Sequence, residues 1–127
     1  MDKLQALYLF FSSFGISAFD ENGVPYEYSF DNPSNTTKQP YLTYSVEVGD
    51  YGDEVYTSFS LWYYSNSWTS IESKRKDIEN ALKDGGVNIP YNEGNIWIKK
   101  SNPFAQRIGD SNDAVRRYKI NIAVEYH

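Results

Sequence analysis

The chain has 127 residues, close to the commonest size of a single domain and enough to bury a core without disulfides or metals. It contains no cysteine and one histidine, His127, so thiolate metal sites, histidine-based zinc sites and Ser/His/Asp triads are excluded. The net charge of −5 argues against non-specific nucleic-acid binding, because contacts with phosphates need a basic surface.

The N-terminal segment predicts a helix over residues 3–13, with Asp2 as the N-cap. Leu9 and Phe10 lie off its main apolar stripe, so a second face should be covered by the core or by a neighbouring subunit. The apolar run 6–11 is too short for a signal peptide or a membrane span. We therefore expect a protein kept in a cytoplasm-like compartment.

Extended structure is expected at residues 16–19 and, more loosely, at 24–30. Residues 31–40 predict a polar loop, because Asn, Pro, Ser and Thr dominate them. A β-hairpin follows, with strands at 41–48 and 55–64 that are rich in β-branched and aromatic residues. One face of the second strand mixes serines with large aromatic residues and is expected to lie against a partner or a helix: Tyr56, Ser58, Ser60, Trp62 and Tyr64.

A second helix is predicted over residues 68–84, with Ser67 as the N-cap and Gly85-Gly86 at its end. Arg75 falls within its apolar stripe and can lay its stem along apolar surface. The basic run 74–76 fits a solvated face with i,i+4 ion pairs better than a nucleic-acid site.

Short strands are expected at 87–89 and 95–99, a connecting loop at 103–112, and a strand at 118–126 that alternates strictly between apolar and polar residues. This order of elements predicts an α+β fold in which two helices pack on a mostly antiparallel β-sheet. Neither a repeat nor a linker is visible, so residues 1–127 should form a single domain.

Charge and aromatic residues are distributed unevenly. Residues 1–66 hold nine acidic and two basic residues (net −7), whereas residues 67–127 hold eight acidic and ten basic residues (net +2). This asymmetry either serves solubility alone or lets copies of the chain associate head to tail. Tryptophan, tyrosine and phenylalanine make up 17% of the chain, and a core of this size cannot satisfy twelve buried tyrosine hydroxyls. We expect the surplus at protein interfaces rather than on a carbohydrate or single-stranded nucleic-acid platform.

Two charged groups are candidates for function. Asp50, Asp53 and Glu54 could form a carboxylate site, but they lack the ligand order of a calcium loop and better fit the caps of a hairpin turn. A basic group should gather near one sheet edge if the strands at 95–99 and 118–126 pair: Lys99, Lys100, Arg116, Arg117 and Lys119. It either protects that edge or contacts an acidic neighbour, and its arginines favour the contact.

Four segments stand in a recognisable order and spacing: Phe14-Gly15-Ile16-x-Ala18-Phe19 followed by Val24-Pro25, Pro40-Tyr41-Leu42-Thr43-Tyr44, Trp97-Ile98-Lys99-Lys100 through Pro103-Phe104-Ala105-Gln106-Arg107, and Arg116-Arg117-Tyr118-Lys119-Ile120-Asn121. Together they resemble the tail terminator (tail completion, or minor tail protein) family of long-tailed bacteriophages of Gram-positive bacteria. The resemblance spans nearly the whole chain, which departs from the family by a longer polar insertion at 31–40.

The resemblance implies a small α/β fold, without cofactor, metal or catalytic residue, that forms a six-membered ring on the tail tube. The ring would stop tube polymerisation and dock to the head connector, so the implied partners are further copies, the tail tube protein and a head-completion or connector protein. Its implied location is the head–tail interface of the virion, after assembly in the host cytoplasm.

DNA would pass through such a ring without specific binding, along an acidic surface formed by Asp50, Asp53 and Glu54. The candidate residues for the interfaces with subunits and partners are Trp62, Trp97, Lys99, Lys100, Phe104, Arg107, Arg116 and Arg117.

Other functions stay open. A head-completion or connector-adaptor protein has the same size, acidity and lack of chemistry, and would be present in twelve copies beside the portal. An aromatic-rich domain that binds a carbohydrate or small ligand is a further alternative. An enzyme is the least supported, because Asp, Glu, Tyr and Lys alone would have to do all acid–base work.

Overall fold

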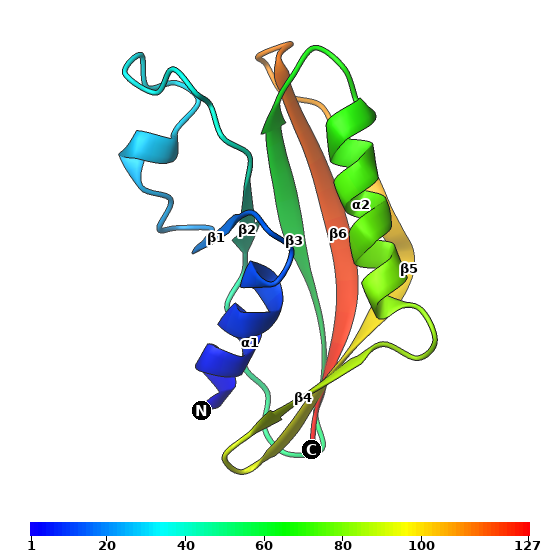
Figure 1. Ribbon diagram of the computed structural model, residues 1–127. Coiled ribbons are helices and arrows are strands. Elements are labelled where there is room, and N and C mark those ends of the chain that lie inside the picture. The colour runs from blue at the N-terminus through cyan, green and yellow to red at the C-terminus, as the bar shows by residue number, and fades with distance from the viewer.

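The computed structural model describes residues 1–127 and is built on a six-stranded sheet with the strand order β1-β2-β3-β6-β5-β4 (Figure 1). Neighbouring strands are antiparallel, except for β1 and β2, which are parallel. With two helices on this sheet, the predicted α+β fold is confirmed. The elements are α1 (Lys3–Ser12), β1 (Ser17–Asp20), a 3-10 turn (Tyr26–Tyr28), β2 (Tyr41–Tyr44), β3 (Glu54–Tyr64), α2 (Thr69–Leu82), β4 (Val87–Tyr91), β5 (Gly94–Ile108) and β6 (Val115–Tyr126).

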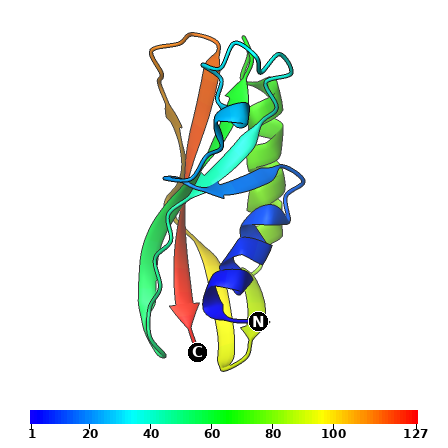
Figure 2. The ribbon, with the colours of Figure 1, turned by 90° about the vertical axis from the view of Figure 1, so that its left-hand side faces the viewer.

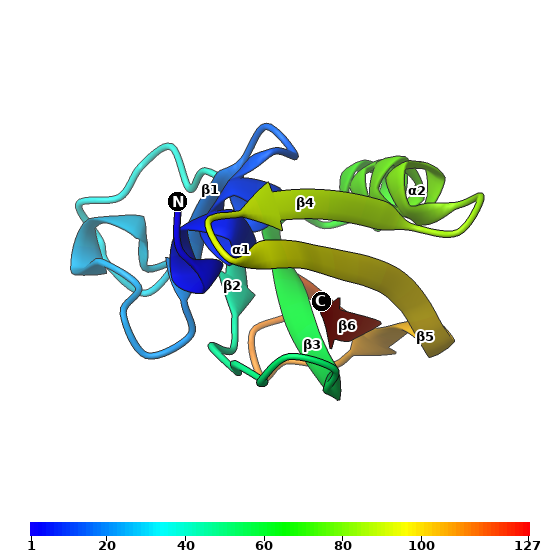
Figure 3. The same ribbon diagram turned by 90° about the horizontal axis from the view of Figure 1, so that it is seen from below.

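Both helices lie on one face of the sheet, which curls toward them (Figures 2 and 3). The inward residues of β6 alternate as predicted and are 0–7% exposed: Tyr118, Ile120, Ile122, Val124 and Tyr126. The helices contribute these residues to the same core: Ala6, Leu7, Phe10, Phe11, Ile71, Ile78 and Leu82. Neither helix has the length and apolar content needed to cross a membrane. The other face of the sheet carries no helix, so of the two covers expected for the serine-and-aromatic face of β3, a partner or a helix, the helix is excluded.

The N-cap was predicted correctly for α1 but not for α2. Asp2 caps α1 as predicted, since its side chain accepts a hydrogen bond from the Gln5 N–H (2.8 Å) and the Gln5 side chain accepts one from the Asp2 N–H (2.9 Å). In α2 the N-cap position belongs to Trp68, not to Ser67. The Ser67 hydroxyl accepts only a long hydrogen bond, 3.4 Å, from the N–H of Thr69.

The expected strand at 24–30 does not form, and a short 3-10 turn takes its place. Two buried asparagines hold this segment through its carbonyl groups. Asn32 donates to the carbonyl of Tyr26 (3.2 Å), and Asn35 donates to the carbonyl of Ser29 (3.0 Å). These local side-chain bonds give the backbone partners other than a neighbouring strand.

The predicted hairpin is only partly formed. β2 ends at Tyr44 rather than at Val48, and it pairs with β3 only from Tyr41↔Trp62 to Tyr44↔Phe59. Residues 45–53 follow as an irregular connection. Side chains from other elements hold this connection, as described below.

The expected loop at 103–112 is wrong for its first half, because β5 continues to Ile108. Its pairing with β6 shifts register between Lys100 and Ala105 and resumes at Ala105↔Ile120. This bulge changes the pairing partner without ending the strand. The remaining connection is a turn in which the side chains of Asp110 and Asn112 each accept a backbone hydrogen bond.

Candidate interaction surfaces

The outer side of α1 is apolar and open to solvent. Its inner side is buried against the sheet, but Leu4, Tyr8 and Leu9 are each 51–53% exposed, and Met1 is 41% exposed. Lys3 is the only charged residue within the helix. We call Met1, Leu4, Tyr8 and Leu9 the α1 patch. Apolar side chains exposed on one helix face are typical of a protein contact. Of the two residues expected off the main stripe, Leu9 lies on this exposed face, whereas Phe10 is 4% exposed and belongs to the core.

The helix-free face of the sheet is aromatic at one end. There Trp62 stacks on Tyr41, with ring centroids 6.2 Å apart, and its indole N–H donates to the Thr43 hydroxyl (2.9 Å). The Arg117 guanidinium lies 4.7 Å from the Trp62 ring and donates to the Ser60 hydroxyl (3.1 Å). Trp62 is thus fixed within its own subunit by three neighbours, which prepares a rigid stacked surface.

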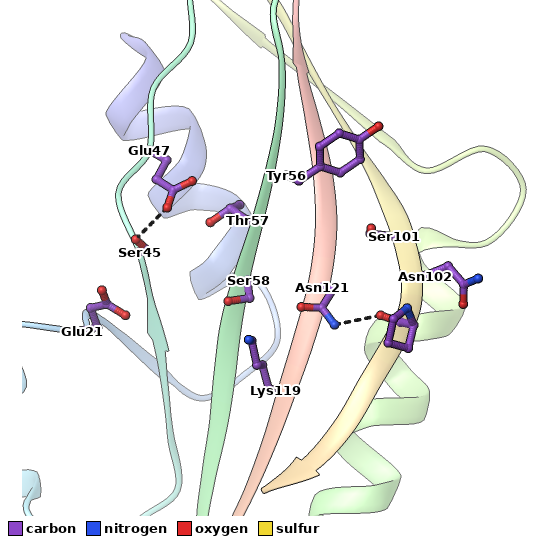
Figure 4. Close-up of a pocket in the computed structure, with 11 residues that line it drawn as sticks. Glu21, Ser45, Glu47, Tyr56, Thr57, Ser58, Ser101, Asn102, Lys119 and Asn121 are labelled. Atoms are coloured by element: carbon purple, nitrogen blue, oxygen red, sulfur yellow. Dashed lines mark hydrogen bonds between the residues drawn. The ribbon is translucent and has the colours of Figure 1, made fainter.

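The other end of this face is a polar groove (Figure 4). It lies between the connection after β2, which contributes Ser45 and Glu47, and the strands β3, β6 and β5. Tyr56 is its one exposed ring, at 70% exposure. The other lining residues are Glu21, Thr57, Ser58, Ser101, Asn102, Pro103, Lys119 and Asn121.

Beside this groove, Lys99 lies between two carboxylates. Its ammonium group is 2.9 Å from Glu125 and 3.7 Å from Glu54. The Glu54 carboxyl and the Lys99 ammonium hold the pKa of Glu125 well below its usual value, at about 2. Lys99 also lies over the ring of Trp97, whose indole N–H donates to the carbonyl of Gly85 (2.6 Å).

A second network fastens α2 to the far ends of β5 and β6. Glu72 accepts hydrogen bonds from the Tyr118 hydroxyl, from Arg75 and from Arg107, the last at 3.1 Å. These donors, with Tyr118 the strongest, lower the pKa of Glu72 to about 2. Arg107 also lies over the indole of Trp68, at 4.6 Å.

The acidic residues expected on a DNA path lie together at one tip of the molecule. Asp50, Asp53 and Glu54 are exposed. The Asp53 carboxylate accepts a hydrogen bond from the Asp50 N–H (2.8 Å), so the predicted turn-capping role is confirmed. No group of three or more acidic or histidine residues is arranged to hold a metal ion.

The predicted basic group does not gather at one sheet edge, and that expectation is wrong. β6 is an interior strand, and successive side chains point to opposite faces. Arg117 and Lys119 therefore lie on the open face with Lys99, whereas Arg116 lies on the helix side and donates to the carbonyl of Asn66 (3.0 Å). Lys100 also lies on the helix side, 3.9 Å from a carboxylate of α2.

The eight candidate interface residues thus divide between two faces. The open face holds Trp62, Trp97, Lys99 and Arg117. The helix side holds Lys100, Phe104, Arg107 and Arg116. Sequence reasoning missed the α2 network, for which the one signal was an arginine within an apolar stripe.

No protein-family model, no curated protein and no solved structure matches the chain.

Proposed function

We propose that this chain is a structural protein of a long-tailed bacteriophage that assembles into a ring on the tail tube. The ring ends tube polymerisation and offers the docking surface for the head connector. The observation that carries the proposal is the α1 patch, because an apolar helix face that the subunit leaves open needs a neighbour.

The four segments that resemble the tail terminator family support the proposal in a second way, because they form two paired units of the sheet. The first two lead into β1 and β2, which pair in parallel through Ala18↔Leu42. The last two lie in β5 and β6, which pair through Ala105↔Ile120. Each pair of segments thus lies side by side in the sheet.

In such a ring the same two surfaces meet at every contact, the α1 patch of one copy against a different surface of the next. The open sheet face is suited to that second role, because Trp62 and Arg117 present a stacked aromatic and cationic surface. The acidic tip, with Asp50, Asp53 and Glu54, is assigned to the DNA path.

The test is electron microscopy and light scattering of the purified chain, alone and with self-polymerised tail tubes. We expect six-fold rings alone or at tube ends, and the double variant Leu4→Glu/Leu9→Glu to abolish them. Tyr26→Ser is the matched control, because Tyr26 is 69% exposed but lies outside the α1 patch. A chain that is strictly monomeric and never caps tubes contradicts the proposal. Rings of twelve beside the portal would assign the chain to the connector adaptors instead.

A further inference from the structure

A strand-like sequence continues past the end of β2 without being paired. β2 and β3 pair in one register from Tyr41↔Trp62 to Tyr44↔Phe59. Residues 45–48 read Ser-Val-Glu-Val, an alternation with β-branched residues that favours a strand. Val46 and Val48 are nevertheless 44% and 50% exposed.

If the pairing register of β2 and β3 continued beyond Tyr44, it would close a regular hairpin. It would pair Ser45 with Ser58, Glu47 with Tyr56, and Gly49 with Glu54. The four residues left over, 50–53, already form a turn, in which the Asp53 N–H donates to the carbonyl of Asp50 (2.9 Å). Four-residue connections are common in hairpins. The chain thus has the register, the residues and the turn for a hairpin that it does not complete.

Two side chains hold the segment instead. The Tyr126 hydroxyl donates to the carbonyl of Glu47 (2.9 Å), and the Lys3 ammonium donates to the carbonyl of Gly49 (2.9 Å). Burial raises the pKa of Tyr126, so its hydroxyl keeps the proton that it donates. Gly49 is closely seated there, since an added Cβ would lie 3.0 Å from the Tyr126 ring.

These two carbonyls are the ones that the completed hairpin would direct at β3. Backbone groups alternate in direction along a strand. The carbonyl of Tyr44 faces β1, where it accepts from the N–H of Glu21 (3.0 Å). The carbonyls of residues 45, 47 and 49 would therefore face β3. Directly before β3, the carbonyl of Asp53 faces β6, where it accepts from the Tyr126 N–H (3.0 Å). The N–H groups of 54, 56 and 58 on β3 therefore face the connection.

We propose that residues 45–49 are a strap with two positions, held by Lys3 and Tyr126 in this structure and able to complete the hairpin with β3 when released. No backbone hydrogen bond joins residues 45–49 to residues 54–58 in the held position. The polar groove between Ser45, Glu47 and β3 is the space that the strap would close (Figure 4).

Closure would turn Val46 and Val48 to the same side as Thr57 and Val55, the side of the core, and so would bury apolar surface. It would also remove an open strand edge, which is prone to unwanted pairing. Because Lys3 belongs to α1, a movement of α1 acts directly on the strap.

The test is a disulfide between residues that would face each other in the completed hairpin. No other thiol competes, because the chain has no cysteine. The pair Val46→Cys/Thr57→Cys is made in the natural chain and in the Lys3→Met/Tyr126→Phe background, and the rate of intramolecular disulfide formation is followed by mass spectrometry in a fixed thiol buffer. We expect release of both contacts to raise the rate on the order of 20-fold, from about fivefold for each hydrogen bond. The pair Val46→Cys/Val55→Cys, out of register by two residues, should stay slow.

Equal rates in the two backgrounds, or an equally fast out-of-register pair, would overturn the proposal. So would a single Thr57→Cys chain that forms dimers faster than the paired variant closes, since β3 then receives a strand from a second copy. Hydrogen exchange of the cysteine-free Lys3→Met/Tyr126→Phe chain gives an independent answer. The amides of Tyr56 and Ser58 should become more protected although two bonds are lost, and unchanged or lower protection counts against the strap.

Discussion

The hydroxyl of Tyr118 on β6 donates a hydrogen bond to the carboxylate of Glu72 on α2, and it accepts one from Arg107 on β5 (3.1 Å). One phenol thus joins α2, β5 and β6. Tyr118 is 7% exposed, so its ring is part of the core while its oxygen reaches the surface network.

We expect Tyr118→Phe to lower the free energy of unfolding by about 1 kcal/mol, and by no more than about 2 kcal/mol, because Glu72 and Arg107 keep each other as partners. Urea denaturation followed by circular dichroism measures this change. The control is Tyr63→Phe, which removes the hydroxyl of a half-buried tyrosine outside the network and should change stability by less than about 0.5 kcal/mol. Equal losses in both variants would show that the network contributes nothing specific.

Acid should weaken the fold through Glu72 and Glu125. Folding lowers the pKa of each from its usual value, 4.5, to about 2. The stabilisation they give is therefore complete above pH 4.5 and is lost as the pH falls toward 2. Unfolding free energies measured at several pH values between 6 and 2 should fall over that window. Glu72→Gln should be less stable at pH 6 but should show a shallower decline, and a parallel decline would contradict the assignment.

The end of α2 offers a prediction with a closely matched control. Gly85 and Gly86 both have φ of +95°, so alanine at either position is strained by a left-handed backbone conformation. Only at Gly86 would the new Cβ also collide with the backbone carbonyl of Ile98, whereas nothing lies near it at Gly85. We expect Gly85→Ala to cost about 1 kcal/mol and Gly86→Ala at least about 2 kcal/mol more, measured by thermal and urea unfolding. Similar losses of stability in the two variants would mean that the β5 backbone shifts to accommodate the new Cβ.

The acidic tip can be tested by charge reversal. If Asp50 and Asp53 face the DNA path, Asp50→Lys/Asp53→Lys leaves ring assembly intact and makes the rings retain DNA in a gel-shift assay at low salt. Asp53→Asn is the control for the loss of the turn cap, because it weakens the bond to the Asp50 N–H without adding positive charge. Loss of rings in the reversed variant would place these residues at a subunit contact instead.

The sequence predicts best where one local pattern decides the structure. β6 alternates without interruption, and α1 combines a capping residue with helical spacing, so both were predicted closely. The apolar outer face of α1 was predicted only in part, since Leu9 lies on it but Phe10, also expected off the packing stripe, is buried.

Other parts depend on partners that no local pattern reveals. Pro103 favours a loop, and its segment is a strand only because β6 offers a partner after the bulge. Residues 45–48 favour a strand, and they are irregular because Tyr126 and Lys3 compete for their carbonyls. The α2 network brings Glu72 together with Arg107 and Tyr118, which lie 35 and 46 positions later in the sequence. No local sequence pattern predicts contacts at that separation.

The order of the strands also sets the order of events during synthesis. β6 lies between β3 and β5, and its pairing with β3 reaches from Glu54↔Glu125 to Tyr64↔Val115. Until β6 has left the ribosome, β3 and β5 each have an unpaired edge, and the core lacks the buried side chains of β6. Such intermediates aggregate readily and fold slowly, because the decisive contacts are distant in sequence. A nascent chain that ends before Val115 should therefore need a chaperone, and the proposed ring could assemble only after translation has passed the last strand.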